Sequence, residues 1–72
     1  MKRLDAKALY VAMDAERQRR GISWEQLSRE IGVSASTLRR IKSGGRMEVD
    51  GMLAMVYWLE RKVEDFVIDS PI

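Results

Sequence analysis

The sequence predicts an all-α fold, a compact bundle of about five short helices in a single domain that spans residues 1–72. Three observations lead to this fold class. Apolar residues recur at helical spacing along most of the chain. Polar capping residues precede these segments and glycines follow several of them, as helix ends require. A chain of 72 residues has length for one domain only.

The first predicted helix begins after Asp5, a favourable N-cap residue, and runs to about Arg20. Leu9 and Met13 lie one turn apart and form the centre of its apolar stripe. Gly21 follows the last turn, where a glycine commonly ends a helix. This segment is expected to support the rest of the bundle.

The second predicted helix has a clear sequence signature at each end. Ser23 is followed three residues later by Gln26, which is the spacing of a capping box. Leu27 and Ile31 are four residues apart and are expected to face the core. Gly32 then breaks the helix and tolerates a positive φ angle.

The third predicted helix begins after its cap residue, Ser34, and places Leu38 and Ile41 toward the core. Only three residues, 32–34, connect it to the second helix. A turn of three to four residues that contains glycine is the geometry of a helix-turn-helix. Residues 22–44 are therefore predicted to form this motif.

The C-terminal part of the chain is more apolar. A fourth helix is predicted over Val49–Leu59, and from Met52 onward it has almost no polar side. The residues expected to face the core are Met52, Leu53, Val56 and Leu59. A short fifth helical turn around Val63 and Phe66 is expected to close the core, and residues 69–72 are expected to fray.

The composition excludes several classes of function. The chain has no His and no Cys, which removes the commonest general base and the commonest metal ligands. We therefore expect that the protein is not an enzyme and that it has no metal site and no cofactor. No apolar run approaches the roughly 20 residues of a membrane span, and residues 1–10 lack the apolar core of a signal peptide. A soluble cytoplasmic protein, associated with the nucleoid, is expected.

The charges are distributed unevenly. Residues 1–46 hold eleven basic and five acidic residues, a formal charge of +6, whereas residues 47–72 hold two basic and six acidic residues, a charge of −4. A basic region that contains the predicted helix-turn-helix favours a polyanionic partner. Ordinary scatter of charge in a charged domain is the alternative interpretation.

These features together resemble the Cro/C1-type helix-turn-helix domain, the Xre or lambda repressor-like family. The residues that carry the resemblance are Gly21, Ile22, Ser23, Leu27, Ile31, Gly32, Val33, Ser34, Ser36, Thr37, Leu38, Ile41, Gly44, Leu53, Val56, Leu59 and Phe66. The resemblance implies a bundle of about five helices and sequence-specific binding of DNA by prokaryotic or phage regulators, generally as dimers.

Three positions depart from the pattern of that family. Trp24 stands where the family often has Gln, and Ser28 stands where it often has Ala. Lys42 replaces a Glu that commonly pairs with an Arg of the first helix, so that Arg17 has no acid at this place. Lys42 instead adds positive charge to the presumed DNA-binding face.

The resemblance also implies which residues contact DNA. By position, the residues expected at base edges are Ala35, Ser36, Arg39 and Arg40 of the third helix, which would lie in the major groove. An arginine can bind guanine O6 and N7 with two hydrogen bonds. We expect either Arg39 or Arg40 to bind a guanine, and the other arginine can contact phosphate.

Phosphate contacts are expected at both edges of the motif. The candidates are Arg17, Ser23, Trp24, Ser34, Lys42, Ser43, Gly45 and Arg46. Several have another interpretation: Ser23 and Ser34 are helix caps first, Trp24 can belong to the core, and Arg17 can bind an internal partner. Such contacts would fix the orientation on DNA without reading its sequence.

The surplus of apolar residues in the fourth helix predicts a homodimer. The expected interface residues are Met55, Trp58, Val67 and Ile68. A monomer in which the first helix and the tail cover these residues is the alternative. Each protomer of a dimer would bind one of two DNA half-sites about 34 Å apart.

The leading functional prediction is a transcriptional regulator that binds double-stranded operator DNA as a homodimer. We expect no effector domain, so repression by occlusion is simpler than activation. The alternative is a small protein-interaction module, or an antitoxin-like accessory factor of the same fold, that uses the fourth helix and Trp24 to bind another protein.

Overall fold

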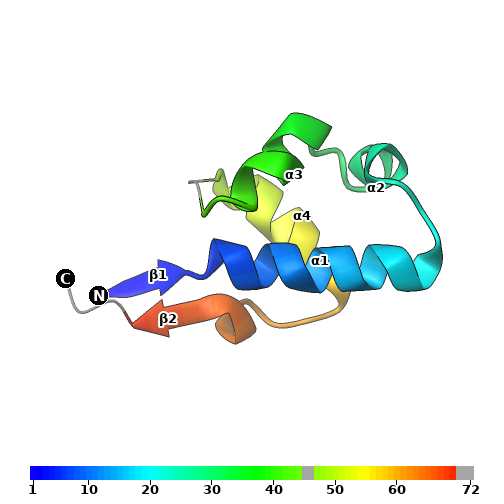
Figure 1. Cartoon of the computed structure of the whole chain (residues 1–72). Coiled ribbons are helices and arrows are strands. Elements are labelled where there is room, and N and C mark those ends of the chain that lie inside the picture. The colour runs from blue at the N-terminus through cyan, green and yellow to red at the C-terminus, as the bar shows by residue number, and fades with distance from the viewer. Residues whose placement is uncertain (45–46, 70–72) are drawn as a thin grey trace.

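The computed structural model describes residues 1–44 and 47–69 and shows a mostly helical domain with a small two-stranded sheet (Figure 1). In chain order the elements are β1 (Lys2–Leu4), α1 (Ala6–Arg20), α2 (Trp24–Ile31), α3 (Ala35–Ile41), α4 (Val49–Leu59), the 3₁₀ helix η1 (Val63–Phe66) and β2 (Val67–Asp69). The predicted fold class is confirmed, with four α-helices and the fifth helical turn at the expected place.

The sheet was not predicted. β1 and β2 pair antiparallel and project from one end of the helical body, which brings Lys2 beside Asp69 (Figure 1). Lys2 Nζ lies 2.7 Å from Asp69 Oδ1 across this ribbon. Asp69 therefore belongs to a strand instead of a frayed tail, and residues 70–72 of that predicted tail lie outside the described residues. Three-residue strands are too short to give a periodic sequence signal.

The helix caps follow the sequence signals. Asp5 Oδ1 accepts a hydrogen bond from the Ala8 N–H at 3.1 Å and so caps α1. Ser23 and Gln26 form the predicted capping box at the start of α2. Gly21 and Gly32 end α1 and α2 with φ angles of 68° and 72° in the left-handed region. These caps satisfy amides and carbonyls that a helix end leaves without partners.

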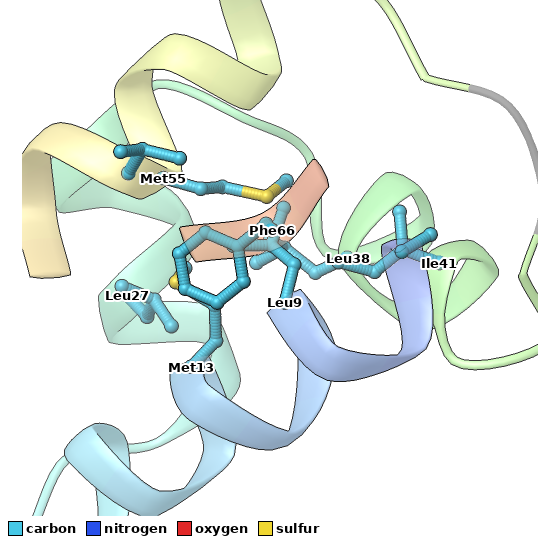
Figure 2. Close-up of a cluster of buried hydrophobic side chains, with 9 residues drawn as sticks. Leu9, Met13, Leu27, Leu38, Ile41, Met55 and Phe66 are labelled. Carbon is cyan, nitrogen blue, oxygen red and sulfur yellow. The ribbon is translucent and has the colours of Figure 1, made fainter. Parts of the chain in front are cut away.

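The core lies where α1 meets the other helices. Seven buried side chains meet there, and their exposed fractions lie between 0 and 3% (Figure 2). They are Leu9 and Met13 of α1, Leu27 of α2, Leu38 and Ile41 of α3, Met55 of α4, and Phe66 of η1. Helix α1 contacts α3, α4 and η1, so it holds the helix-turn-helix and the C-terminal region on one support.

Helix α4 is rotated about its axis relative to the prediction. Leu53, which was assigned to the core, is 47% exposed, and Met55, which was assigned to an outer surface, is completely buried. Val56 is buried as predicted. A helix that is apolar on nearly every side does not encode which side faces inward, so this part of the prediction was wrong.

Candidate nucleic-acid interface

The turn between α2 and α3 fixes how α3 is presented. Gly32 donates its N–H to the Ser28 carbonyl at 2.9 Å and turns the chain out of α2. Ser34 then caps α3 by accepting the Thr37 N–H at 3.2 Å. Leu27 and Leu38 anchor the two helices in the core. The opposite side of α3 is left facing the solvent.

The outer face of α3 carries positive charge. Ser36, Arg39 and Arg40 are exposed, and Ala35 is half-buried beside them. These are the four residues expected at base edges, and α3 brings them together. The sequence has no acidic residue from position 32 to position 44. A polyanion that approaches this face therefore meets cations and hydroxyls, with no carboxylate from α3 or from the turn before it.

Three side chains one turn apart form a line along α3. Ser34 Oγ lies 2.8 Å from Thr37 Oγ1, and Arg40 Nη2 donates to the same Thr37 oxygen at 3.3 Å. Because Ser34 is the cap residue, these contacts hold the Arg40 guanidinium toward the N-terminal end of the helix. Thr37 was not among the predicted site residues, although the i, i+3 spacing of Ser34, Thr37 and Arg40 is visible in the sequence.

The other arginine of α3 is not held in this way. The Arg39 side chain makes no hydrogen bond or ion pair within residues 1–44 and 47–69. Lys42 is exposed beyond the last turn, and the Ser43 hydroxyl donates to the Arg40 carbonyl at 3.0 Å. The two remaining predicted phosphate contacts at this edge, Gly45 and Arg46, lie outside the described residues.

Arg17 is committed to the interior, which was the alternative to its predicted phosphate contact. Its Nη1 donates to the Ile22 carbonyl at 2.9 Å, and its Nη2 donates to Asp14 Oδ1 at 2.8 Å. The side chain is 20% exposed. Arg17 therefore ties α1 to the start of the helix-turn-helix, which favours the internal role that was the alternative to a phosphate contact.

The acid that pairs with Arg17 comes from α1 itself. The hydrogen bond from Arg17 lowers the pKa of Asp14 below its ordinary value of 3.8, against a smaller opposing effect of burial. The charge of Lys42 contributes a weaker lowering of the same pKa. The acid that pairs with Arg17 therefore lies on the same helix, α1, and the end of α3, where the family commonly has a Glu, carries Lys42 instead.

Trp24 packs inside the domain instead of projecting from it. Its ring stacks on Tyr10 with centroids 5.2 Å apart, and the Arg17 guanidinium lies 4.9 Å from the ring centre. Its indole N–H donates no hydrogen bond within the part of the chain that the structure describes. The ring is therefore half-buried structure, and only the N–H remains for the predicted phosphate contact.

Two cap serines and one lysine complete the edges of the motif. Ser23 and Ser34 are exposed, as phosphate contacts would require, while each also caps its helix. Lys7 of α1 was not among the predicted phosphate contacts. A Cβ built on Gly44 would lie 3.4 Å from Lys7 Cε, so the Lys7 side chain runs beside the end of the motif. A separation of 37 positions gives no local signal for this neighbour.

The residues expected at a dimer interface occupy different environments. Met55 is buried in the core of the protomer and is excluded from any interface. Trp58 is half-buried, and the Arg20 guanidinium lies 4.3 Å from its ring centre. Val67 and Ile68 are exposed on β2, at 37% and 47%. The structure therefore does not bring these four residues into one surface.

The described residues offer neither a metal site nor a helix that could span a membrane. Among them, no group of three or more His, Cys, Asp or Glu side chains is placed to hold a metal ion. No helix within residues 1–44 and 47–69 combines the length and the apolar character that a membrane span needs.

The geometry of α2, its turn and α3 defines a DNA-binding helix-turn-helix. The model of one protein family, described as helix-turn-helix, matches residues 14–51, which is more than half of the chain. The chain therefore belongs to this family of Cro/C1-type DNA-binding domains. Comparisons with curated proteins and with solved structures found no match.

Proposed function

We propose that this protein is a sequence-specific transcriptional regulator that binds double-stranded DNA with α3 in the major groove. The observation that carries the proposal is the outer face of α3, which is exposed, free of carboxylates and lined by two arginines. A recognition helix places its N-terminal residues at base edges. Such a protein would act on DNA in the cytoplasm of a prokaryotic or phage-infected cell.

The contacts of the two arginines support different roles for them. Arg40 is held toward the N-terminal end of α3 by Thr37, so we assign Arg40 to a guanine. Two parallel hydrogen bonds to guanine O6 and N7 are worth about 1–3 kcal/mol of discrimination against other bases. Arg39 has no internal partner in the described chain, and we assign it to the DNA backbone.

The remaining proposed contacts surround this centre. Ala35 and Ser36 complete the base-facing surface, where an alanine can touch a thymine methyl group. The backbone contacts that we propose on the two edges are Ser23, Trp24 N–H, Ser34, Lys42, Ser43, Gly45 and Arg46, and we add Lys7 because its side chain runs beside Gly44. Contacts of this kind set the orientation of the protein on the duplex and make its affinity depend on salt.

Regulation by repression is the simplest use of this domain. We propose that a homodimer covers an operator of two half-sites and blocks access to it. The alternative, a protein-interaction module or antitoxin-like factor, was expected to use Trp24 and the fourth helix. The stacking of Trp24 on Tyr10 argues against binding of a partner protein through Trp24. The exposed apolar residues of α4 favour binding of a partner through that helix.

The proposal is tested by selecting DNA from a random pool with the purified protein and sequencing the bound fraction. An enriched inverted repeat that contains G in each half supports it. The absence of any enriched sequence would refute sequence-specific binding and favour the protein-interaction alternative.

The roles of the arginines are tested on the selected sequence with three substitutions. We expect Arg40→Ala to weaken specific binding by about tenfold or more and to relax the preference for G. Arg39→Ala should weaken binding to all sequences equally. Arg29→Ala removes an exposed arginine of α2 and serves as the matched control. Unchanged discrimination in Arg40→Ala would overturn its assignment to a base.

A further inference from the structure

Helix α4 presents an apolar face to solvent that the fold leaves uncovered. Tyr57 is 87% exposed, Val49 63% and Leu53 47%. These residues lie at i, i+4 and i+8, on one side of the helix. Asp50 and the half-buried Ala54 lie beside them. In the described part of this small domain, no other helix exposes three large apolar side chains in one row.

We propose that this α4 face is the docking surface for a second copy of the same chain, with the two α4 helices antiparallel. The proposal rests on the homodimer of the proposed function and gives that dimer a defined interface. It replaces the interface expected from the sequence, of which Met55 is buried in the protomer.

The sequence of α4 is complementary to itself in the antiparallel arrangement. Residues 50 and 57 are equidistant from the point between Leu53 and Ala54 along the helix. A twofold axis at that point therefore places the Asp50 carboxylate opposite the Tyr57 hydroxyl of the second copy, and does so twice. The hydroxyl can donate a hydrogen bond to the carboxylate, and a bond of this kind to a charged group is among the stronger ones.

The middle of the same arrangement pairs a large side chain with a small one. Leu53 of each copy meets Ala54 of the other across the axis, so that a projecting side chain faces a shallow position. A twofold interface must use the same surface on both copies. Large and small residues adjacent at the centre of one helix satisfy this requirement.

The dipoles of the two α4 helices also favour an antiparallel second copy, because they are then opposed. Asp50 lies in the first turn of α4, and Arg61, which follows the helix, lines one groove together with Tyr57 and with the acidic residues Glu30 and Glu60. This end of α4 therefore carries charges of both signs, and Arg61 is a residue there that can attract Asp50 of the second copy. Arg61 is paired with Asp65 in its own chain at 2.9 Å, so its contribution is secondary to that of Tyr57.

The exposed edge of β2 is the competing surface for a second copy. Val67 and Ile68 are exposed there, but β2 has only three residues. Short edge strands are a common protection against pairing with another chain. The edge also offers few backbone hydrogen bonds, so the longer face of α4 is favoured.

The experiment measures the oligomeric state of the full chain by sedimentation velocity over a range of concentrations. Leu53→Glu places a charge at the proposed axis, and Ile68→Glu places the same charge on β2. The two residues are equally exposed, at 47%, so the variants are matched. We expect a wild-type dimer, a monomer for Leu53→Glu and a dimer for Ile68→Glu. A monomeric wild-type chain, or the reverse response of the variants, would overturn the proposal.

A milder pair of substitutions tests the predicted contact without adding a charge to an apolar surface. Asp50→Ala and Tyr57→Phe each remove both symmetry-related hydrogen bonds and should each weaken dimerisation by about a hundredfold or more. The double variant should be little weaker than either single variant, because both remove the same bonds. Additive losses would contradict the pairing of these residues. Thermal unfolding of each variant confirms that the protomer is folded.

This inference and the DNA-binding proposal can fail separately. Arg40→Ala should weaken specific DNA binding by about tenfold or more and leave the dimer intact. A dimer that depends on Leu53 but selects no DNA sequence would refute the proposed function and support the α4 interface. Selection of a single half-site by a monomeric wild-type chain would support the function and refute the interface.

Discussion

The helix-turn-helix (residues 22–44) and the C-terminal region (residues 49–69) are packed on the same helix, α1, but they use apolar residues differently. In α2 and α3 the apolar residues form one narrow stripe each, and the remaining positions are polar. In α4 apolar residues surround almost the whole helix. A one-sided helix encodes its own orientation, whereas an apolar helix receives its orientation from its neighbours.

The ends of the helices differ in the same way. Helix α2 ends at Gly32, with φ at 72°, where glycine has no steric cost. Helix α4 ends at Glu60, which adopts φ of 57° although it has a Cβ. A left-handed conformation of this kind costs a non-glycine residue roughly 1–2 kcal/mol. The helix-turn-helix therefore has favourable end residues that α4 lacks.

The largest effect expected from this comparison concerns two leucines that the sequence pattern treats alike. Leu38→Ala removes a completely buried side chain of α3 and should lower the free energy of unfolding by about 2–5 kcal/mol. Leu53→Ala removes a side chain of α4 that is 47% exposed and should change it by about 0.5 kcal/mol or less in the monomer. Chemical denaturation at low protein concentration measures both.

The concentration of protein separates the two roles of Leu53. At high concentration the wild-type chain gains apparent stability from dimerisation, because dissociation is coupled to unfolding. Leu53→Ala should lose part of this gain and therefore be less stable than wild type there. Equal and large losses for both alanine variants at low concentration would show that Leu53 is a core residue after all and would remove the contrast between the two regions.

The same contrast explains how much could be predicted from the sequence. The capping box of Ser23 and Gln26 and the turn at Gly32 have short-range causes, and both were predicted correctly. The rotation of α4 depends on how α1 and α2 pack against it, so the positions of Leu53 and Met55 were predicted wrongly. A local sequence pattern predicts which side of a helix faces the core only where one side is clearly more polar than the other.

The candidate site shows the same division. The exposure of Ser36, Arg39 and Arg40 follows from the spacing of the buried residues of α3. The position of Lys7 beside Gly44 does not, since it depends on the packing of α1 against the end of the motif. The internal role of Arg17 requires the Ile22 carbonyl as an acceptor, and backbone groups in a loop leave no mark in the sequence.

An intermediate effect is expected from exchanging the residue types at the two helix ends. Gly32→Ala should destabilise the domain by about 1 kcal/mol, because alanine is strained at this φ angle while nothing lies within 4 Å of its Cβ. Glu60→Gly should stabilise the domain by up to about 1 kcal/mol, because it relieves the strain of a left-handed glutamate.

Thermal unfolding of the two single variants and of the double variant measures this exchange. The N–H of Gly32 bonds the Ser28 carbonyl and that of Glu60 bonds the Tyr57 and Val56 carbonyls, so the two effects should add. A destabilising Glu60→Gly would mean that the glutamate side chain makes a compensating contribution at the end of α4. The two helix ends would then be equally well adapted by different means.

The smallest expected effect distinguishes the two Asp–Arg pairs. Hydrogen bonds from Arg17 and Arg61 lower the pKa values of Asp14 and Asp65, respectively, below 3.8. The charged form of each acid therefore stabilises the fold above that pH, and the contribution disappears as the pH falls through the lowered pKa. Asp14 should contribute more, because its partner also binds the Ile22 carbonyl and contacts Trp24.

Thermal unfolding of Asp14→Asn and Asp65→Asn across this acid range tests the difference. We expect Asp14→Asn to lower the melting temperature at neutral pH, and the difference from wild type to shrink as the pH falls and the wild-type acid is protonated. Asp65→Asn should have little effect, since both side chains of its pair are at least 40% exposed. A loss in Asp14→Asn that did not depend on pH would place the contribution in the geometry of the Arg17 bonds instead of the carboxylate charge. The connection between α1 and the helix-turn-helix would then depend on the geometry of the Arg17 hydrogen bonds and not on the charge of Asp14. In this respect it would resemble the packing of α4, which depends on apolar contacts and not on charge.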